Sequence, residues 1–104
     1  MARSNTLGMP RIGPRREMKR AIEGYWAGTT DGPGLAEAAR LVRARNWREQ
    51  VEAGIENIAS NDFTLYDQVL DTTCLVGAIP DRFGVDASPS DLDTYFSLAR
   101  GTTA

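Results

Sequence analysis

The sequence has no histidine and only one cysteine, Cys74, among its 104 residues. A lone cysteine cannot form a disulfide within the chain and has no histidine to activate it, so we expect it to pack as a small apolar side chain. Zinc in proteins is held by three or four cysteine, histidine or acidic ligands. These absences exclude Ser-His and Cys-His nucleophilic chemistry within this chain, and they argue against a self-contained zinc site.

Long apolar runs are also missing. Nowhere do about 18 apolar residues follow one another, as a membrane-spanning helix requires, and the basic N-terminus carries no apolar run of signal-peptide length. The sequence therefore predicts a cytoplasmic protein with no membrane contact.

Charge is distributed unevenly along the chain. Residues 1–20 hold six basic residues and one acidic residue, whereas residues 51–104 hold two basic and nine acidic residues. The basic region is too short to follow a nucleic acid backbone, and the chain as a whole has a net charge of −2. We therefore expect the partner to be a small anion or a local acidic surface, and not a nucleic acid.

Apolar periodicity and breaker residues predict two short strands, over residues 5–9 and 55–59. Four helices are expected over about residues 15–27, 35–54, 66–77 and 90–99, the last with Ser90 and Asp93 as an N-cap pair. The order of elements is that of a helix-rich α/β chain with parallel strands. Two strands cannot by themselves form a stable open sheet or close a barrel.

The apolar face of the second predicted helix starts at Leu35 and is expected to continue through Trp47 and Val51. The aromatic residues recur at apolar helical spacing, which is typical of core or interface anchors rather than of ligand contacts. They are Tyr25, Trp26, Trp47, Tyr66 and Tyr95.

The most informative segment for function is the basic segment, residues 7–20, in which Arg15, Arg16, Lys19 and Arg20 occupy the opening turns of the first predicted helix. Cations there are unfavourable for the helix, because its free N–H groups already carry partial positive charge. A bound carboxylate or phosphate would compensate, and arginine offers a fork of donors that matches one. Arg16 and Lys19 are three residues apart and are expected to face the same side. The alternative is a solvated basic helix end, with Glu17 making local pairs.

A second candidate site consists of Asn61, Asp62, Asp67 and Asp71. Asp62 follows the second predicted strand, where α/β folds place their ligand sites, although an aspartate there also serves as a helix N-cap. Asp67 and Asp71 are four residues apart on a predicted helix. Two carboxylates alone are weak evidence for a cation site, so we expect them on a solvated or salt-bridged face.

Four motifs, in order, resemble the N-terminal part of cobalamin-independent methionine synthase. They are TLGMPRIGPRREMK at residues 6–19, YWAG at 25–28, DFTLYDQVLD at 62–71, and DTYF at 93–96 followed by Ala99-Arg100-Gly101. Met9 stands where the family more usually has Phe, and Gln68 where many members have His. The motifs cover nearly the whole chain, although the enzymes of this family are much longer.

This resemblance implies a fold and a function. Members of the family consist of two (β/α)8 barrels and pass the methyl group of 5-methyltetrahydrofolate polyglutamate to homocysteine, giving methionine. Zinc and homocysteine are bound by the C-terminal barrel, and the N-terminal barrel helps to hold the polyglutamate tail. The resemblance places the tail-binding segment on Arg16, Glu17, Met18 and Lys19. It implies that residues 1–104 are the first βα units of the N-terminal barrel, without a catalytic residue, metal or cofactor of their own.

Two other hypotheses stay open. One is a stand-alone, non-catalytic module that binds an anion or another protein through the basic segment. The other is a truncated product whose exposed apolar surface drives self-association. The expected partners are therefore 5-methyltetrahydropteroyltriglutamate and either the rest of the two-barrel enzyme or a second copy of the chain.

Overall fold

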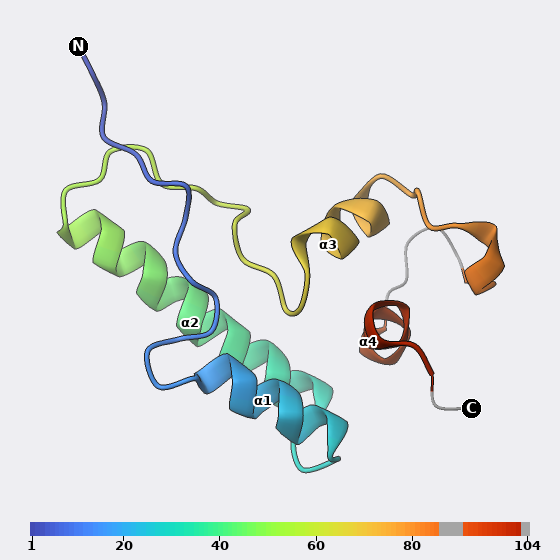
Figure 1. The fold of residues 1–104 in the computed structure, drawn as a ribbon. Coiled ribbons are helices and arrows are strands. Elements are labelled where there is room, and N and C mark those ends of the chain that lie inside the picture. The colour runs from blue at the N-terminus through green and yellow to red at the C-terminus, as the bar shows by residue number, and fades with distance from the viewer. Residues whose placement is uncertain (86–90, 103–104) are drawn as a thin grey trace. The chain divides into compact units, whose positions relative to one another are not determined.

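The computed structural model describes residues 1–85 and 91–102, and the chain forms two compact units, Met1–Leu65 and Tyr66–Ala104 (Figure 1). The first unit contains α1 (Glu17–Trp26) and α2 (Gly32–Glu52). The second contains α3 (Gln68–Leu75), the 3-10 helix η1 (Asp81–Phe83) and α4 (Leu92–Arg100). The prediction of a helix-rich chain is confirmed for the described residues, and α1 to α4 correspond to the four predicted helices.

α1 and α2 pack side by side as an antiparallel pair and form the core of the first unit (Figure 1). The buried apolar side chains are Met18 and Ile22 on α1 and Leu35, Ala39 and Val42 on α2. Their spacing of three or four residues places each set on one face of its helix. Met18 and Leu35 are fully buried, with 0% of each residue exposed to solvent.

The buried face of α2 becomes polar over its last turns. Asn46 and Gln50 are only 6% and 4% exposed, and they continue the spacing set by Ala39 and Val42. The predicted continuation of an apolar face to Val51 is wrong, because Val51 is 63% exposed. This part of α2 therefore buries polar side chains, and the N-terminal segment supplies partners for them.

The two predicted strands do not form in the described part of the chain. An isolated parallel bridge joins Asn5 to Asn57, and the N–H of Asn57 donates to the Ser4 carbonyl at 3.0 Å. The predicted parallel direction agrees with this bridge. The pairing does not extend, because Gly8 has a φ of 128° and Pro10 has no N–H to donate. The strand prediction is therefore wrong in extent.

Aspartates cap three of the helices. Asp31, Asp67 and Asp91 precede α2, α3 and α4, and each accepts a hydrogen bond from the backbone N–H three residues later, at 2.7–2.8 Å. Asp67 is exposed, as predicted, but it lies at the N-cap of α3 and not within the helix. The predicted cap at Ser90 lies outside the described residues.

An aromatic cluster forms the core of the second unit. Phe96 is 5% exposed, and its ring meets the rings of Tyr66 and Tyr95 edge to face, at centroid distances of 6.3 and 5.3 Å. The Tyr95 hydroxyl donates to Asp71 at 2.6 Å and accepts from the Tyr66 N–H at 3.2 Å. The prediction that these tyrosines are core anchors is confirmed. The prediction for Asp71 is wrong, since its carboxylate is half-buried and bonded to a tyrosine.

Candidate anion-binding site

The basic segment forms a loop that leads into α1. The helix begins at Glu17, two residues later than predicted, and Arg16 is its N-cap with φ 58° and ψ 38°. Arg16 is the one non-glycine residue in the described part of the chain with a positive φ. This left-handed conformation costs free energy for an arginine, and such residues cluster at binding sites. Because Arg16 lies outside the helix, helical spacing does not fix its direction relative to Lys19.

The four cations at the start of α1 lie at the surface. Arg15, Arg16, Lys19 and Arg20 are all exposed. Lys19 pairs with Glu23 at 3.3 Å, but both side chains are more than half exposed, so the pair contributes about 0–1 kcal/mol. The Arg20 guanidinium donates to the Arg15 carbonyl. These weak or local contacts leave the side chains able to turn toward a ligand.

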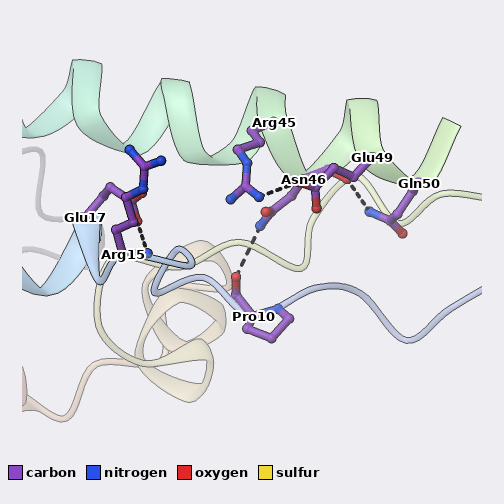
Figure 2. Close-up of polar contacts among 7 residues, drawn as sticks. All are labelled: Pro10, Arg15, Glu17, Arg45, Asn46, Glu49 and Gln50. Atoms are coloured by element: carbon purple, nitrogen blue, oxygen red, sulfur yellow. Dashed lines mark hydrogen bonds and ion pairs between the residues drawn. The ribbon is translucent and has the colours of Figure 1, made fainter. Parts of the chain in front are cut away.

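Glu17, the first residue of α1, carries a carboxylate next to these cations in the sequence. It accepts a hydrogen bond from the Arg15 N–H at 3.0 Å (Figure 2). A hydrogen bond from its own backbone N–H is the main cause that lowers the pKa of Glu17, and the Arg15 N–H and the nearby Arg45 and Arg20 add to it. Glu17 therefore stays ionised near neutral pH and satisfies N–H groups at the start of α1.

Replacing Glu17 with glutamine is expected to lower the thermal unfolding midpoint at pH 7 and to flatten its acid dependence. The pKa of Glu17 in the folded chain lies below its ordinary value of 4.5. The stability that it contributes is therefore present above that value and is lost as the pH falls through the folded pKa. Thermal scans of both proteins between pH 7 and pH 3 measure the effect. Glu52→Gln, at the exposed end of α2, is the matched control. Identical pH profiles for the unmodified chain and Glu17→Gln would contradict this role.

The four residues to which the resemblance assigns tail binding differ in whether a ligand can reach their side chains. Met18 is 0% exposed and belongs to the core, so its side chain is closed to a ligand in this conformation. Glu17 is half-buried and bonded to the loop backbone. Arg16 and Lys19 present charged side chains to solvent. Of the four, these two are the ones that the structure leaves accessible to an anion.

The buried polar side chains of α2 hold the loop in place. The Asn46 amide donates from Nδ2 to the Pro10 carbonyl at 3.2 Å (Figure 2). Gln50 accepts from the Thr6 hydroxyl at 2.7 Å and donates from Nε2 to the Asn46 carbonyl at 3.1 Å. Sequence reasoning missed both residues, although their positions four and eight residues after Val42 continue the buried face.

Asp62 anchors the loop from the other side. Its carboxylate accepts the Met9 N–H at 2.9 Å, and Arg11 donates from Nη1 to the Leu65 carbonyl at 3.0 Å. The alternative that Asp62 is a helix N-cap is wrong, because Asp67 fills that position. The Asp62 side chain instead joins the end of the second predicted strand to the loop that follows the first predicted strand.

Other parts of the described chain fit an anion or a metal poorly. No three histidine, cysteine or acidic side chains among the described residues could hold a metal ion together, so these residues do not fit zinc. A groove of about 350 Å³ between α3 and α4 has no basic side chain in its lining.

Burial, followed by the charge of Asp71, raises the pKa of the Cys74 thiol. None of the described helices is long and apolar enough to span a membrane.

Comparison with known proteins identifies relatives along almost the full chain. The family model of the cobalamin-independent synthase N-terminal domain matches residues 3–104. The 5-methyltetrahydropteroyltriglutamate–homocysteine methyltransferase of Nitrobacter winogradskyi is 57% identical over 96 residues, and that of Salinibacter ruber is 50% identical over 101 residues. These matches cover 92% and 97% of this chain but only 12% and 13% of the two relatives. The chain belongs to the cobalamin-independent methionine synthase family and corresponds to part of its N-terminal domain.

Proposed function

We propose that this chain is part of a cytoplasmic methyltransferase that passes a methyl group from 5-methyltetrahydropteroyltriglutamate to homocysteine, forming methionine. Within it, Arg16 and Lys19 bind the polyglutamate tail of the folate. Family membership supports the reaction, since the names of the relatives state both substrates. The observation that carries the tail site is the group of four exposed cations, Arg15, Arg16, Lys19 and Arg20, at the start of α1.

The chemistry of the tail suits this surface. A triglutamate tail is a flexible chain of carboxylates, and it needs several cations spread over a short distance rather than one deep pocket. The Arg16 guanidinium can bind one carboxylate with two parallel hydrogen bonds, and the Lys19 ammonium supplies a mobile point charge. The proposed role is binding, and no chemical step is assigned to residues of this chain.

We also propose that residues 1–104 are the first βα units of a (β/α)8 barrel. The parallel bridge between Asn5 and Asn57 supports this, because neighbouring strands of such a barrel run parallel. The basic segment and Asp62 both follow the bridged residues in the chain, and Asp62 contacts Met9 at 2.9 Å. Both would then lie at the carboxyl ends of adjacent strands, where these barrels build their sites.

Calorimetric titration of the 104-residue chain tests the tail site. The triglutamate form of 5-methyltetrahydrofolate is expected to bind roughly tenfold more tightly than the monoglutamate, because two exposed charge pairs of up to about 1 kcal/mol each are added. The double variant Arg16→Ala/Lys19→Ala should lose most of the preference for triglutamate. Raising the salt concentration should weaken triglutamate binding more than monoglutamate binding, since exposed charges are screened.

The matched control is Arg82→Ala/Arg100→Ala, which removes the same charge from the second unit. It should keep the preference for triglutamate. Equal affinity of the unmodified chain for the two folates would overturn the proposed tail site. Equal affinity for triglutamyl folate and free triglutamate would favour the stand-alone anion-binding module instead.

A further inference from the structure

α2 brings a cation of its own to the loop. The Arg45 side chain leaves α2 on the side of the loop that carries Pro10, Arg15 and Glu17 (Figure 2). The next residue, Asn46, is 6% exposed and bonded to the Pro10 carbonyl at 3.2 Å, which fixes this face of α2 against the loop. The position of Arg45 therefore follows from a buried contact rather than from a flexible surface segment.

The charge of Arg45 acts on the same carboxylate as the cations of α1. Arg45 and Arg20 both contribute to lowering the pKa of Glu17, after the backbone hydrogen bonds. Glu17 therefore experiences the charge of a cation from α2 as well as that of a cation from α1. The sequence shows only the α1 part of this group of cations.

Arg45 is held by a contact that a ligand can replace. Its guanidinium pairs with Glu49, one turn later on α2, and the two side chains are 41% and 40% exposed. Half-exposed pairs of this kind within one helix are weak, because water competes for both charges and two long side chains lose freedom. Glu49 accepts from Nη2 of Arg45 alone. A carboxylate supplied by a ligand can instead accept two parallel hydrogen bonds from the guanidinium.

We propose that Arg45 is a specificity-determining residue of the anion site. When a polyglutamate tail binds, Arg45 exchanges the carboxylate of Glu49 for a carboxylate of the tail. This inference rests on the proposed function, and it adds that the tail is held between α1 and α2. Arg45 then contributes to the affinity for folates with several glutamates and contributes nothing to the affinity for the monoglutamate.

The test compares Arg45→Ala with Arg40→Ala in the 104-residue chain. Both arginines lie on α2, and each pairs with a glutamate about one turn away, Glu49 for Arg45 and Glu37 for Arg40. We expect Arg45→Ala to weaken triglutamyl folate binding about threefold, because one exposed charge pair is lost, and to leave monoglutamate binding unchanged. Arg40→Ala should change neither. Circular dichroism of each variant checks that the helices remain.

A second variant gives an effect of opposite sign. Glu49→Gln removes the internal competitor for Arg45, so it is expected to tighten triglutamate binding by a few fold without changing monoglutamate binding. This variant keeps the inference testable even if Arg45→Ala disturbs the fold.

The possible outcomes separate this inference from the proposed function. If Arg45→Ala keeps full triglutamate affinity while Arg16→Ala/Lys19→Ala loses most of the preference, the role of Arg45 is overturned and the tail site stands. If Arg45→Ala weakens both folates equally, Arg45 is not a specificity determinant. If the unmodified chain shows no preference for triglutamate, the proposed tail site itself is wrong.

Discussion

Replacing Leu35 with alanine is expected to unfold the first unit at a temperature about 10 °C or more below that of the unmodified chain. Leu35 is 0% exposed and lies on the face of α2 that packs on α1. Removing a buried leucine side chain costs about 2–5 kcal/mol, partly through the cavity that it leaves. A small unit has a limited core and little stability in reserve. A thermal scan that follows the helical circular dichroism signal measures the shift.

Leu41→Ala is the matched control, because it makes the same substitution on the same helix at a side chain that is 54% exposed. Exposed positions away from the core usually change stability by less than about 0.5 kcal/mol. The two variants should therefore differ clearly in their thermal midpoints. Equal midpoints would show that the α1 and α2 interface is not the source of the stability of this unit.

The helices were predictable because their signals are local. Apolar side chains at spacings of three and four residues define the faces that begin at Met18 and Leu35. Aspartates and glycines at the helix ends set the boundaries within a few residues. The start of α1 is later than predicted, because Arg16 adopts a left-handed conformation that no propensity scale favours for arginine. Local propensity therefore fails to predict the conformation of Arg16, which is a residue proposed to bind the tail.

The strands were harder to predict, because pairing depends on residues far apart in the sequence. Residues 5–9 and 55–59 have strand-like composition, but a strand needs partners on both sides or a covered face to be stable. Leu7 is fully exposed, so the first segment buries little apolar surface. What remains of the predicted sheet is the single parallel bridge between Asn5 and Asn57.

The cations of the basic segment were found from the sequence, whereas the residues that shape the loop were not. Asn46, Gln50 and Arg45 look like the solvated face of a helix when taken from composition alone. Their partners lie far away along the chain, at Thr6, Pro10 and the start of α1. One signal was available for Asn46 and Gln50, which continue the spacing of the buried face of α2. No comparable signal exists for Arg45, whose role depends on where the loop lies.

Replacing Gly8 with alanine is expected to destabilise the first unit and to release the loop from Asp62. Gly8 has a φ of 128°, which side chains rarely tolerate, and forcing such a conformation costs of order 1–3 kcal/mol. An added Cβ would stand 2.5 Å from Oδ2 and 2.8 Å from Cβ of Asp62. The Cβ of Asp62 cannot rotate away, so the backbone must shift and the bond from the Met9 N–H to Asp62 is lost. Hydrogen exchange at the Met9 amide, together with a thermal scan, measures both effects.

Gly54→Ala is the matched control. It separates the effect of the contact with Asp62 from the effect of the positive φ. Gly54 also has a positive φ, 82°, but an added Cβ would meet nothing within 4 Å. Gly54→Ala should lower the stability of the first unit less than Gly8→Ala does, and it should leave the hydrogen exchange of the Met9 amide unchanged. Because the loop carries Arg16, Gly8→Ala should also reduce the preference for triglutamyl folate, and Gly54→Ala should not. Equal effects of the two variants on exchange and binding would mean that the contact between Gly8 and Asp62 does not position the anion site.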